Sequence, residues 1–464
     1  MKKLVAGHII RLLKPPHVDD PRQRSGLWYA FGDGVFAIVM SGLMVTHGAA
    51  ALVSLNATQF EIALFGSLPL VLSAATQLGV PYISAYITSR KALIIVSVWT
   101  QTFFTVLVGL SGYYIPQLAP HMFVIFFTLY ATTGSLGAGV WTSWMADLVP
   151  DDIRGRYFAW RNTYLSIIQV SVGIVSGMLM QYYAGPQPGW LVFMVVFMIS
   201  AVSRFFSGIM LLRQYEPPLT YKPVAKDFTY MEFLLKAPTS NFARFTLFIA
   251  LVHGATAIAG PFFSPYFLKD LQMPYLDYSL VSNANLVGML IFLPFWGRIA
   301  DKYGNWFVLK VSAFGIALVP IPYMFLYSFN AMWILGFGAG VLWSAFGLSS
   351  FNYLLDAVTP QRRIRCSAYM TATIGFSVFL FGMSGGWIIY HLQPLWFWHS
   401  SYQTLFLIST AMRLGVVIPF VGFGLVREIR EVHPLHFGDV MSQFPGVQLS
   451  TGMVRNVFRA LRRI

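Results

Sequence analysis

Apolar runs of transmembrane length recur along the whole chain and constrain its fold more than any other feature. A helix of about 20 apolar residues is long enough to cross the hydrocarbon core of a bilayer. Only 10% of the 464 residues are charged, whereas a soluble domain carries about 25%. The sequence therefore predicts an all-α integral membrane protein. Its twelve predicted spans are residues 28–54, 60–86, 92–115, 122–146, 160–184, 190–213, 241–268, 278–300, 305–328, 331–356, 366–390 and 402–427.

The chain is strongly basic, with 31 Lys and Arg against 17 Asp and Glu. All but three of the basic residues lie before the first span, after the last, or in the even-numbered connections and the span ends that border them. The exceptions are Arg204 and Arg413, within spans, and Lys269. The positive-inside rule then places both termini in the cytoplasm. We therefore expect this charge to meet anionic lipid at the cytoplasmic face, and no nucleic acid.

Two separate segments of the sequence recur at one offset. "ADLVPDDIRGRYFA" (146–159) is echoed by "LDAVTPQRRIRCSA" (355–368), and "ISAVSR" (199–204) by "ISTAMR" (408–413), each 209 residues later. A shared offset indicates a tandem repeat of two halves. The predicted organisation is a cytoplasmic amphipathic N-terminus (1–27), a six-helix half (28–213), a cytoplasmic linker (214–240), a second six-helix half (241–427) and a basic amphipathic cytoplasmic tail (428–464).

Twelve spans in two halves with both ends inside resemble the major facilitator superfamily (MFS). The loop "GRIADKYGNWFVLK" (297–310) resembles the superfamily's loop signature through Gly297, Asp301, Lys302 and Gly304. "DLVPDDIRGRYFAWRN" and "GPFFSPYFLKDLQMPY" resemble segments of poorly characterised bacterial members. The resemblance covers nearly the whole chain. It implies the 6+6 MFS fold with a pseudo-twofold axis, in a bacterial inner membrane.

The resemblance also implies a cytoplasmic gate. In the family, an acid at the position of Asp301 caps a helix of the opposite half. In this chain that helix would be the fifth span, near Arg154 and Arg156. A carboxylate at a helix N-terminus is favourable by about 0.3–1 kcal/mol, so the contact can form on closure and break on opening. The first half carries Tyr86 where the second carries Asp301. We therefore expect closure to depend mainly on the Asp301 side.

A transporter of small solutes that works by alternating access is the function that the resemblance implies. The chain has no phosphate-binding loop, so transport would be secondary active or facilitated, with a proton or cation as a possible coupling ion. Nothing in the sequence has catalytic or metal-ligand spacing, so we expect no enzyme activity, metal or cofactor. We expect a monomer to function. The alternative is a transport-inactive membrane scaffold or assembly factor that keeps the fold.

Polar and aromatic residues within the spans are the candidates for substrate binding or coupling. Asp33 and His253 could carry a coupling proton, or could be a structural partner and a packing residue respectively. Trp141 and Trp343 could stack on a solute or pack between helices. A transmembrane amide more often joins two helices than binds a ligand. The amide candidates are Gln77, Asn162, Gln169 and Asn283.

Arg204 and Arg413 are the arginines within the spans, and they repeat each other at the offset of 209 residues. In the MFS fold their helices flank the cavity, so we interpret them as buried structural partners of acids in the same half. The prediction pairs Arg204 with Asp147 or Asp33, and Arg413 with Asp356. Removing one member of a buried ion pair is strongly destabilising. The repeated basic residues beside Asp356, grouped with these ion pairs, are Arg363 and Arg365.

Overall fold

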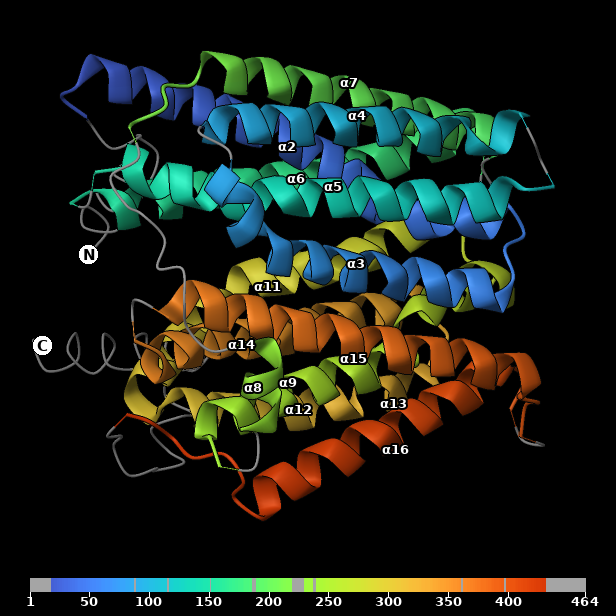
Figure 1. Cartoon of the computed structure of the whole chain (residues 1–464). Coiled ribbons are helices and arrows are strands. Elements are labelled where there is room, and N and C mark those ends of the chain that lie inside the picture. The colour runs from blue at the N-terminus through green and yellow to red at the C-terminus, as the bar shows by residue number, and fades with distance from the viewer. Residues whose placement is uncertain are drawn as a thin grey trace, which may run out of the picture.

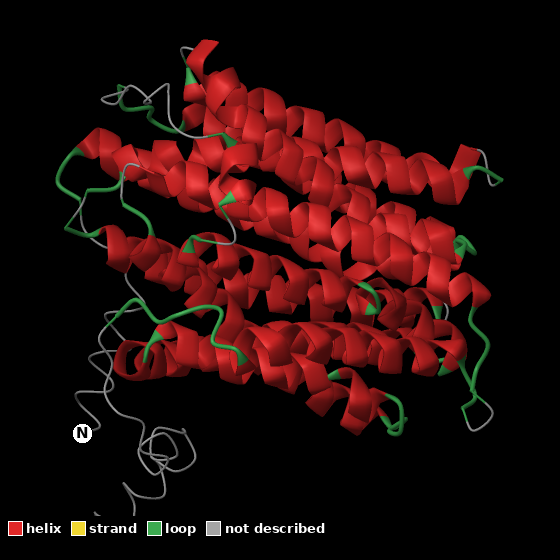
Figure 2. Cartoon of the chain, turned by 60° about the horizontal axis from the view of Figure 1, so that its bottom comes forward, coloured by secondary structure: helices red, strands yellow, loops and turns green. Residues whose placement is uncertain are grey.

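The computed structural model describes residues 18–86, 89–114, 117–150, 152–185, 189–218, 229–236, 239–359, 362–395 and 398–430. Most of the predicted N-terminus (1–27) and tail (428–464) lies outside the described residues, as does the side chain of Tyr86. Twelve helices in the described part are long and apolar enough to cross a membrane. This part contains no strand (Figures 1 and 2). The predicted all-α class with twelve spans is confirmed.

Ten of the spans are single helices. Asp20 caps the first by accepting from the backbone N–H of Arg22, and proline at its first position has no N–H to leave unpaired. The ten are α2 (Pro21–Ser54), α3 (Gln59–Tyr86), α4 (Arg90–Tyr114), α5 (Ala119–Leu148), α6 (Arg154–Ala184), α7 (Trp190–Arg213), α11 (Tyr275–Tyr303), α14 (Phe329–Ala357), α15 (Arg363–His391) and α16 (Ser401–Gly422).

Two spans are broken at prolines, which lack the N–H that a helix interior needs. The ninth span consists of α12 (Asn305–Leu318) and α13 (Pro320–Tyr323). The broken end of the seventh span packs against α2 and α3, across the boundary between the halves. That span runs as α9 (Asn241–Ala257), the turn η1 (Gly260–Phe262), α10 (Phe263–Pro265) and the π-helical turn η2 (Tyr266–Asp270). A short helix, α8 (Tyr230–Leu235), lies in the predicted linker.

Two helices begin earlier than the apolar runs indicate. α2 begins at Pro21 and α6 at Arg154, whereas the predicted spans begin at 28 and 160. The polar residues near these ends are therefore helical. Asp33 lies about three turns into α2, and Arg161, assigned above to a connection, lies about two turns into α6.

The helices form two sets, α2–α7 and α9–α16, which Figure 1 shows one above the other. The two most extensive packings between the sets are α3 against α15 and α6 against α11. Small residues allow α3 and α15 to approach each other closely. A Cβ placed on Gly386 of α15 would lie 2.5 Å from the Cβ of Ala63 on α3. A buried apolar cluster with members from both sets, such as Met44 and Tyr266, lies where α2 ends and α3 begins.

The two ends of the bundle differ, and we name them by this difference. The closed end is the end at which α2 stops and α3 starts, around Ser54–Gln59. The basic end is the opposite one, where α3 stops and α4 starts at Arg90. Because the number of spans is even, α2 begins and α16 ends at the basic end (Figure 1).

Candidate functional site

A polar network crosses the interior of the first half. Asp33 on α2 is only 5% exposed, and its Oδ1 accepts a hydrogen bond of 2.6 Å from the Ser207 hydroxyl on α7. Arg204 donates to the same hydroxyl at 2.9 Å and to Oε1 of Gln101 on α4 at 2.7 Å. Ser207 thus links Arg204 to Asp33. Asp147, the other acid considered for Arg204, pairs elsewhere.

Arg161 is the residue of this region that the sequence analysis missed, because it was counted as a loop residue. It is 8% exposed, and its guanidinium carbon lies 4.7 Å from the centroid of the Trp141 ring. Its Nη2 packs directly on the backbone of α2, 2.5 Å from where a Cβ on Gly34 would lie. Its Nε has no hydrogen-bond partner. Asp33 is near enough to interact electrostatically with both Arg161 and Arg204.

The second half does not repeat this network. Arg413 donates to the backbone oxygen of Ile316 at 2.9 Å and to the Ser409 hydroxyl at 3.1 Å. The predicted pair of Arg413 with Asp356 is wrong. Asp356 lies in the last turn of α14, where it accepts from Arg430 Nε at 2.7 Å and from Asn305 at 2.8 Å. The hydrogen bond that Arg430 donates to Asp356 raises the pKa of Arg430. Arg413 instead donates to two neutral oxygens of its own half, one on α12 and one on its own helix α16.

The second half contributes aromatic rings rather than acids. The imidazole of His253 on α9 lies 5.1 Å from the Trp343 ring and 5.7 Å from the Phe346 ring, between ring centroids. Both aromatic residues are on α14. His253 is thus held by ring packing. It lies in the other half from Asp33, and no described contact joins the two candidates.

The four amide candidates do not form one group. Asn283 is buried at the boundary between α11 and α6, where it packs on Gly173 and donates to the Ser279 carbonyl on its own helix at 2.8 Å. Gln169 of α6 packs beside Gly42 of α2. Gln77 is half-buried on α3, and Asn162 is exposed on α6. Of the four, Asn283 is the one with a described contact to the other half, on Gly173.

The basic end holds matching clusters, one in each half. In the first half Arg90 pairs with Asp147 at 2.5 Å and approaches Glu216 at 3.9 Å. In the second, Asn305 takes the position of Arg90 as the first residue of its helix and binds Asp356. Both clusters stay within their own half, where they tie the ends of three helices together.

The internal repeat reappears in the hydrogen bonds of two arginines. Arg154 donates to the carbonyls of Ala146 and Val149, at 2.6 and 3.3 Å. Arg363 donates to the carbonyls of Leu355 and Val358, at 3.0 and 3.3 Å. All three positions are shifted by the 209 residues of the sequence repeat. These side chains bond the last carbonyls of α5 and α14, which a helix end leaves without partners.

The contacts that the structure describes for the loop-signature residues lie on the second-half side of the molecule. Asp301 is 77% exposed in its side chain, and its ion-pair partner is Arg430 of its own half at 3.8 Å. Lys302 lies over the ring of Tyr303, 5.0 Å from its centroid. Gly304, with φ of 88°, makes the turn between α11 and α12 in a conformation that suits glycine. A Cβ placed on Gly297 would lie 3.8 Å from Leu348, an ordinary contact distance. Arg156 is exposed and Arg365 is half-buried.

All hydrogen bonds that the structure describes between the halves lie at the closed end. The His47 imidazole on α2 bonds to the Tyr275 hydroxyl on α11 and lies 2.7 Å from the Ser176 hydroxyl on α6. The sequence has the same letters, HGA, at His47 and at His253. The two histidines lie at different depths in their spans, so His47 was not among the residues predicted to form a site. The other bonds between the halves are Gln59 to Tyr402 (2.9 Å), Leu276 to Gln181 (2.6 Å) and Ser279 to Gly173 (3.0 Å).

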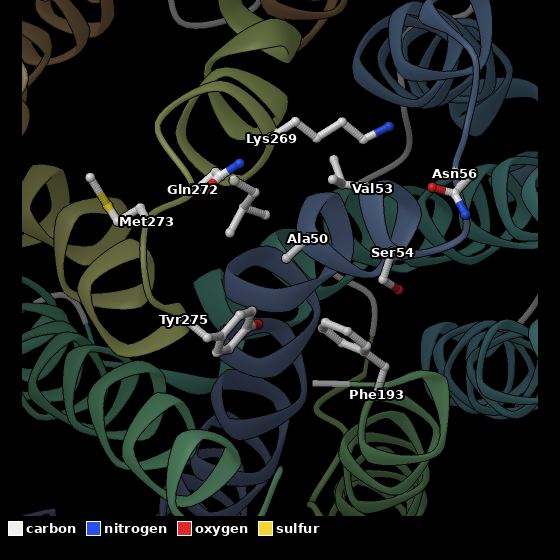
Figure 3. A pocket seen from close by; sticks show the side chains of 10 residues that line it. Ala50, Val53, Ser54, Asn56, Phe193, Lys269, Gln272, Met273 and Tyr275 are labelled. Atoms are coloured by element: carbon white, nitrogen blue, oxygen red, sulfur yellow. The ribbon is translucent and has the colours of Figure 1, made fainter. Parts of the chain in front are cut away.

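A cavity of about 530 Å³ lies above this seam, and both halves line it (Figure 3). Asn56 and Gln272 face it from the loops that follow the first and seventh spans. They are the two non-glycine residues of the described chain with positive φ, at 57° and 47°. Lys269, the basic residue of the opposite-side connections, also lines it. Tyr275, which lines the cavity, also bonds to His47, so the cavity adjoins this contact between the halves.

Comparison with known proteins agrees with this architecture. Residues 245–444 match the family model described as Major Facilitator Superfamily, and a sequence search of curated proteins finds no match. Solved structures match the whole fold at low identity. A mutant of the nucleoside transporter NupG has a TM-score of 0.67 at 14% identity, with 85% of this chain and 99% of that chain covered. The D-xylose-proton symporter scores 0.64 at 12% identity, with 89% and 99% covered.

A bacterial homologue of the iron transporter ferroportin, in an inward-facing state, scores 0.62 at 15% identity, with 86% and 98% covered. Similarity at such low sequence identity shows the fold but does not identify a transported solute. The fold agrees over both halves, and the sequence match covers most of the second. Together with the twelve spans, they show a multi-pass membrane protein with the fold of major facilitator superfamily transporters, and the family model matches its second half.

Proposed function

We propose that the chain moves a small solute across a bacterial inner membrane by alternating access, without ATP hydrolysis. The two halves would rock about a central site, driven by the solute gradient or by a coupled proton or cation. The observation that carries the proposal is the unequal distribution of polar contacts. Every described hydrogen bond between the halves lies at the closed end, while the described ion pairs of Asp147 and Asp356 at the basic end stay within one half.

The positive-inside rule gives this asymmetry a direction. The basic end would face the cytoplasm with both termini, and the closed end would face outward. The described conformation is then an inward-facing one. Its outward-facing counterpart requires the contacts around His47 and Tyr275 to break while new contacts form at the basic end, with Asp301 as the candidate gate residue. Neither change needs a partner protein, which fits a monomeric transporter.

Solute flux in proteoliposomes tests the proposal. The purified full chain is reconstituted and challenged with a broad panel of labelled solutes, with protein-free liposomes as the control. Flux that saturates with solute concentration is the expected result. No flux across the panel, together with stable co-purification of a partner, would instead favour the transport-inactive scaffold. Asp33→Asn then separates coupling from structure, because a coupling role predicts lost gradient-driven uptake with retained exchange.

A further inference from the structure

Arg161 is a buried cation whose donors are unused. The residue is more than nine-tenths buried, its Nε has no partner, and no hydrogen bond of Arg161 is found among the described residues. Arg413, which is as buried as Arg161, and the half-buried Arg204 each donate to two acceptors. A buried polar group without a hydrogen bond carries its full desolvation cost. A structural role explains the two bonded arginines, but it does not explain Arg161.

The charges around Arg161 do not balance. Asp33 is the carboxylate that interacts with both Arg161 and Arg204, and the described hydrogen bond that it accepts comes from Ser207. One acid between two guanidinium groups leaves an excess positive charge. Trp141, over which Arg161 lies, adds a further donor. Its Nε1–H makes no hydrogen bond of good geometry, although its ring lies close to Asp33.

We infer that the solute is an anion whose carboxylate or phosphate oxygens bind Arg161, with a flat or apolar part that packs against Trp141. The inference rests on the proposed transport function and names its substrate class. An arginine with a buried, unpartnered Nε calls for a ligand that accepts hydrogen bonds, and the Trp141 ring beside it offers a flat surface for the rest of that ligand. A guanidinium fork matches both oxyanions, and its bonds to them are stronger than bonds between neutral groups. The excess charge repels a cationic solute.

A first experiment needs no ligand. Thermal unfolding of the full chain in lipid nanodiscs is compared for Arg161→Met and Arg204→Met. Replacing an unpaired buried charge with an apolar side chain of similar length is expected to leave the Tm unchanged or raise it. Arg204→Met is expected to lower the Tm, because Gln101, Ser207 and Asp33 lose a partner. A fall of the Tm in Arg161→Met as large as in Arg204→Met would overturn the inference.

A second experiment identifies the ligand class. Thermal stabilisation is measured with inorganic phosphate, phosphate esters, and aliphatic and aromatic carboxylates, each organic acid matched by the neutral amide and the amine of the same skeleton. We expect stabilisation by oxyanions only, and the separate arms distinguish carboxylates from phosphates. Arg161→Gln is expected to weaken the apparent affinity at least about tenfold. Arg213→Gln, which removes an exposed arginine at the end of α7, serves as the matched control and is expected to change nothing.

Stabilisation by amines or amides, oxyanion binding that survives Arg161→Gln, or no oxyanion binding at all would each refute the inference. The outcomes also distinguish a failure of this inference from a failure of the proposed transport function. Oxyanion binding that depends on Arg161 but leads to no flux would keep the binding site and argue against transport. Flux of a neutral solute that is indifferent to Arg161→Gln would keep transport and refute the anionic substrate.

Discussion

The imidazole of His47 on α2 bonds to the hydroxyl of Tyr275 on α11 and so joins the two halves at the closed end. The other imidazole nitrogen lies 2.7 Å from Ser176 on α6. The ring of Tyr275 is buried and forms part of the wall of the closed-end cavity. This polar contact within an apolar seam is therefore placed to act as a latch between the inward-facing and outward-facing states.

Removing the Tyr275 hydroxyl should loosen the latch. Tyr275→Phe keeps the ring packing and leaves His47 without one of its partners, which destabilises the closed arrangement. Ala50 lines the cavity but is only 2% exposed, so a cysteine there, in a Cys366→Ser background, should be alkylated several-fold faster than in the protein that keeps Tyr275. Tyr278→Phe is the control, because that hydroxyl bonds to Ser264 in the same half. Equal labelling in the two variants would show that the hydroxyl of Tyr275 does not hold the end closed.

Arg90 and Asp147 should be energetically coupled. The Arg90 side chain is 7% exposed and that of Asp147 is 32% exposed, so solvent screens the pair only in part. A double-mutant cycle with Arg90→Gln and Asp147→Asn, read by unfolding in detergent, should give a coupling of about 0.5–3 kcal/mol. A cycle of Arg213→Gln with Asp147→Asn should give none. Additive effects in the first cycle would mean that the pair contributes nothing to the basic end.

Asp301 should matter in the conformation closed at the basic end. In the described one it is largely exposed and near Arg430. Asp301→Asn should therefore shift the population toward the inward-facing state, and alkylation of Thr142→Cys on α5 from the basic end should rise. Asp277→Asn, at the opposite end of the same helix, provides the control. Unchanged labelling in Asp301→Asn would remove this residue from the gate.

Arg204 should be required for folding before it is required for transport. Arg204→Ala takes a hydrogen-bond partner from Gln101 and from Ser207 and removes a positive charge near the buried Asp33. A buried polar group that loses its partner costs about 1–3 kcal/mol. We expect low abundance and a lower Tm, and Arg204→Lys should recover part of both. Normal abundance and Tm with abolished transport would assign Arg204 to the substrate site instead.

The sequence predicts the fold because hydrophobicity and charge determine it at the scale of whole helices. The offset between "ISAVSR" and "ISTAMR" predicts the repeat, and Arg154 and Arg363 reproduce it in their hydrogen bonds. Helix starts are less visible, since a polar first turn such as that of α6 does not raise the hydrophobicity. Arg161 was missed for that reason.

Pairing between side chains was harder to predict than the fold. The repeat suggested that Arg413 should find an acid as Arg204 does, but the second half has no counterpart of Asp33 on α9. Arg413 therefore binds the Ile316 carbonyl, and Asp356 binds Asn305 and Arg430. His47 had no visible signal, because its partners Tyr275 and Ser176 lie far away in sequence and come together only when the halves pack.

Rocking of the two halves is the central claim, and paired distances at the two ends of the bundle test it most directly. Spin labels at Leu118 and Leu395 report on the closed end, and labels at Gly155 and Arg298 report on the basic end, both in nanodiscs. Gly386→Leu serves to force the closed end apart, because its side chain would meet Ala63 across the seam. Gly347→Leu is the control, since a Cβ there meets no atom within 4 Å. The account predicts that Gly386→Leu lengthens the closed-end distance and shortens the basic-end distance together, while a longer closed-end distance with an unchanged basic end would contradict it.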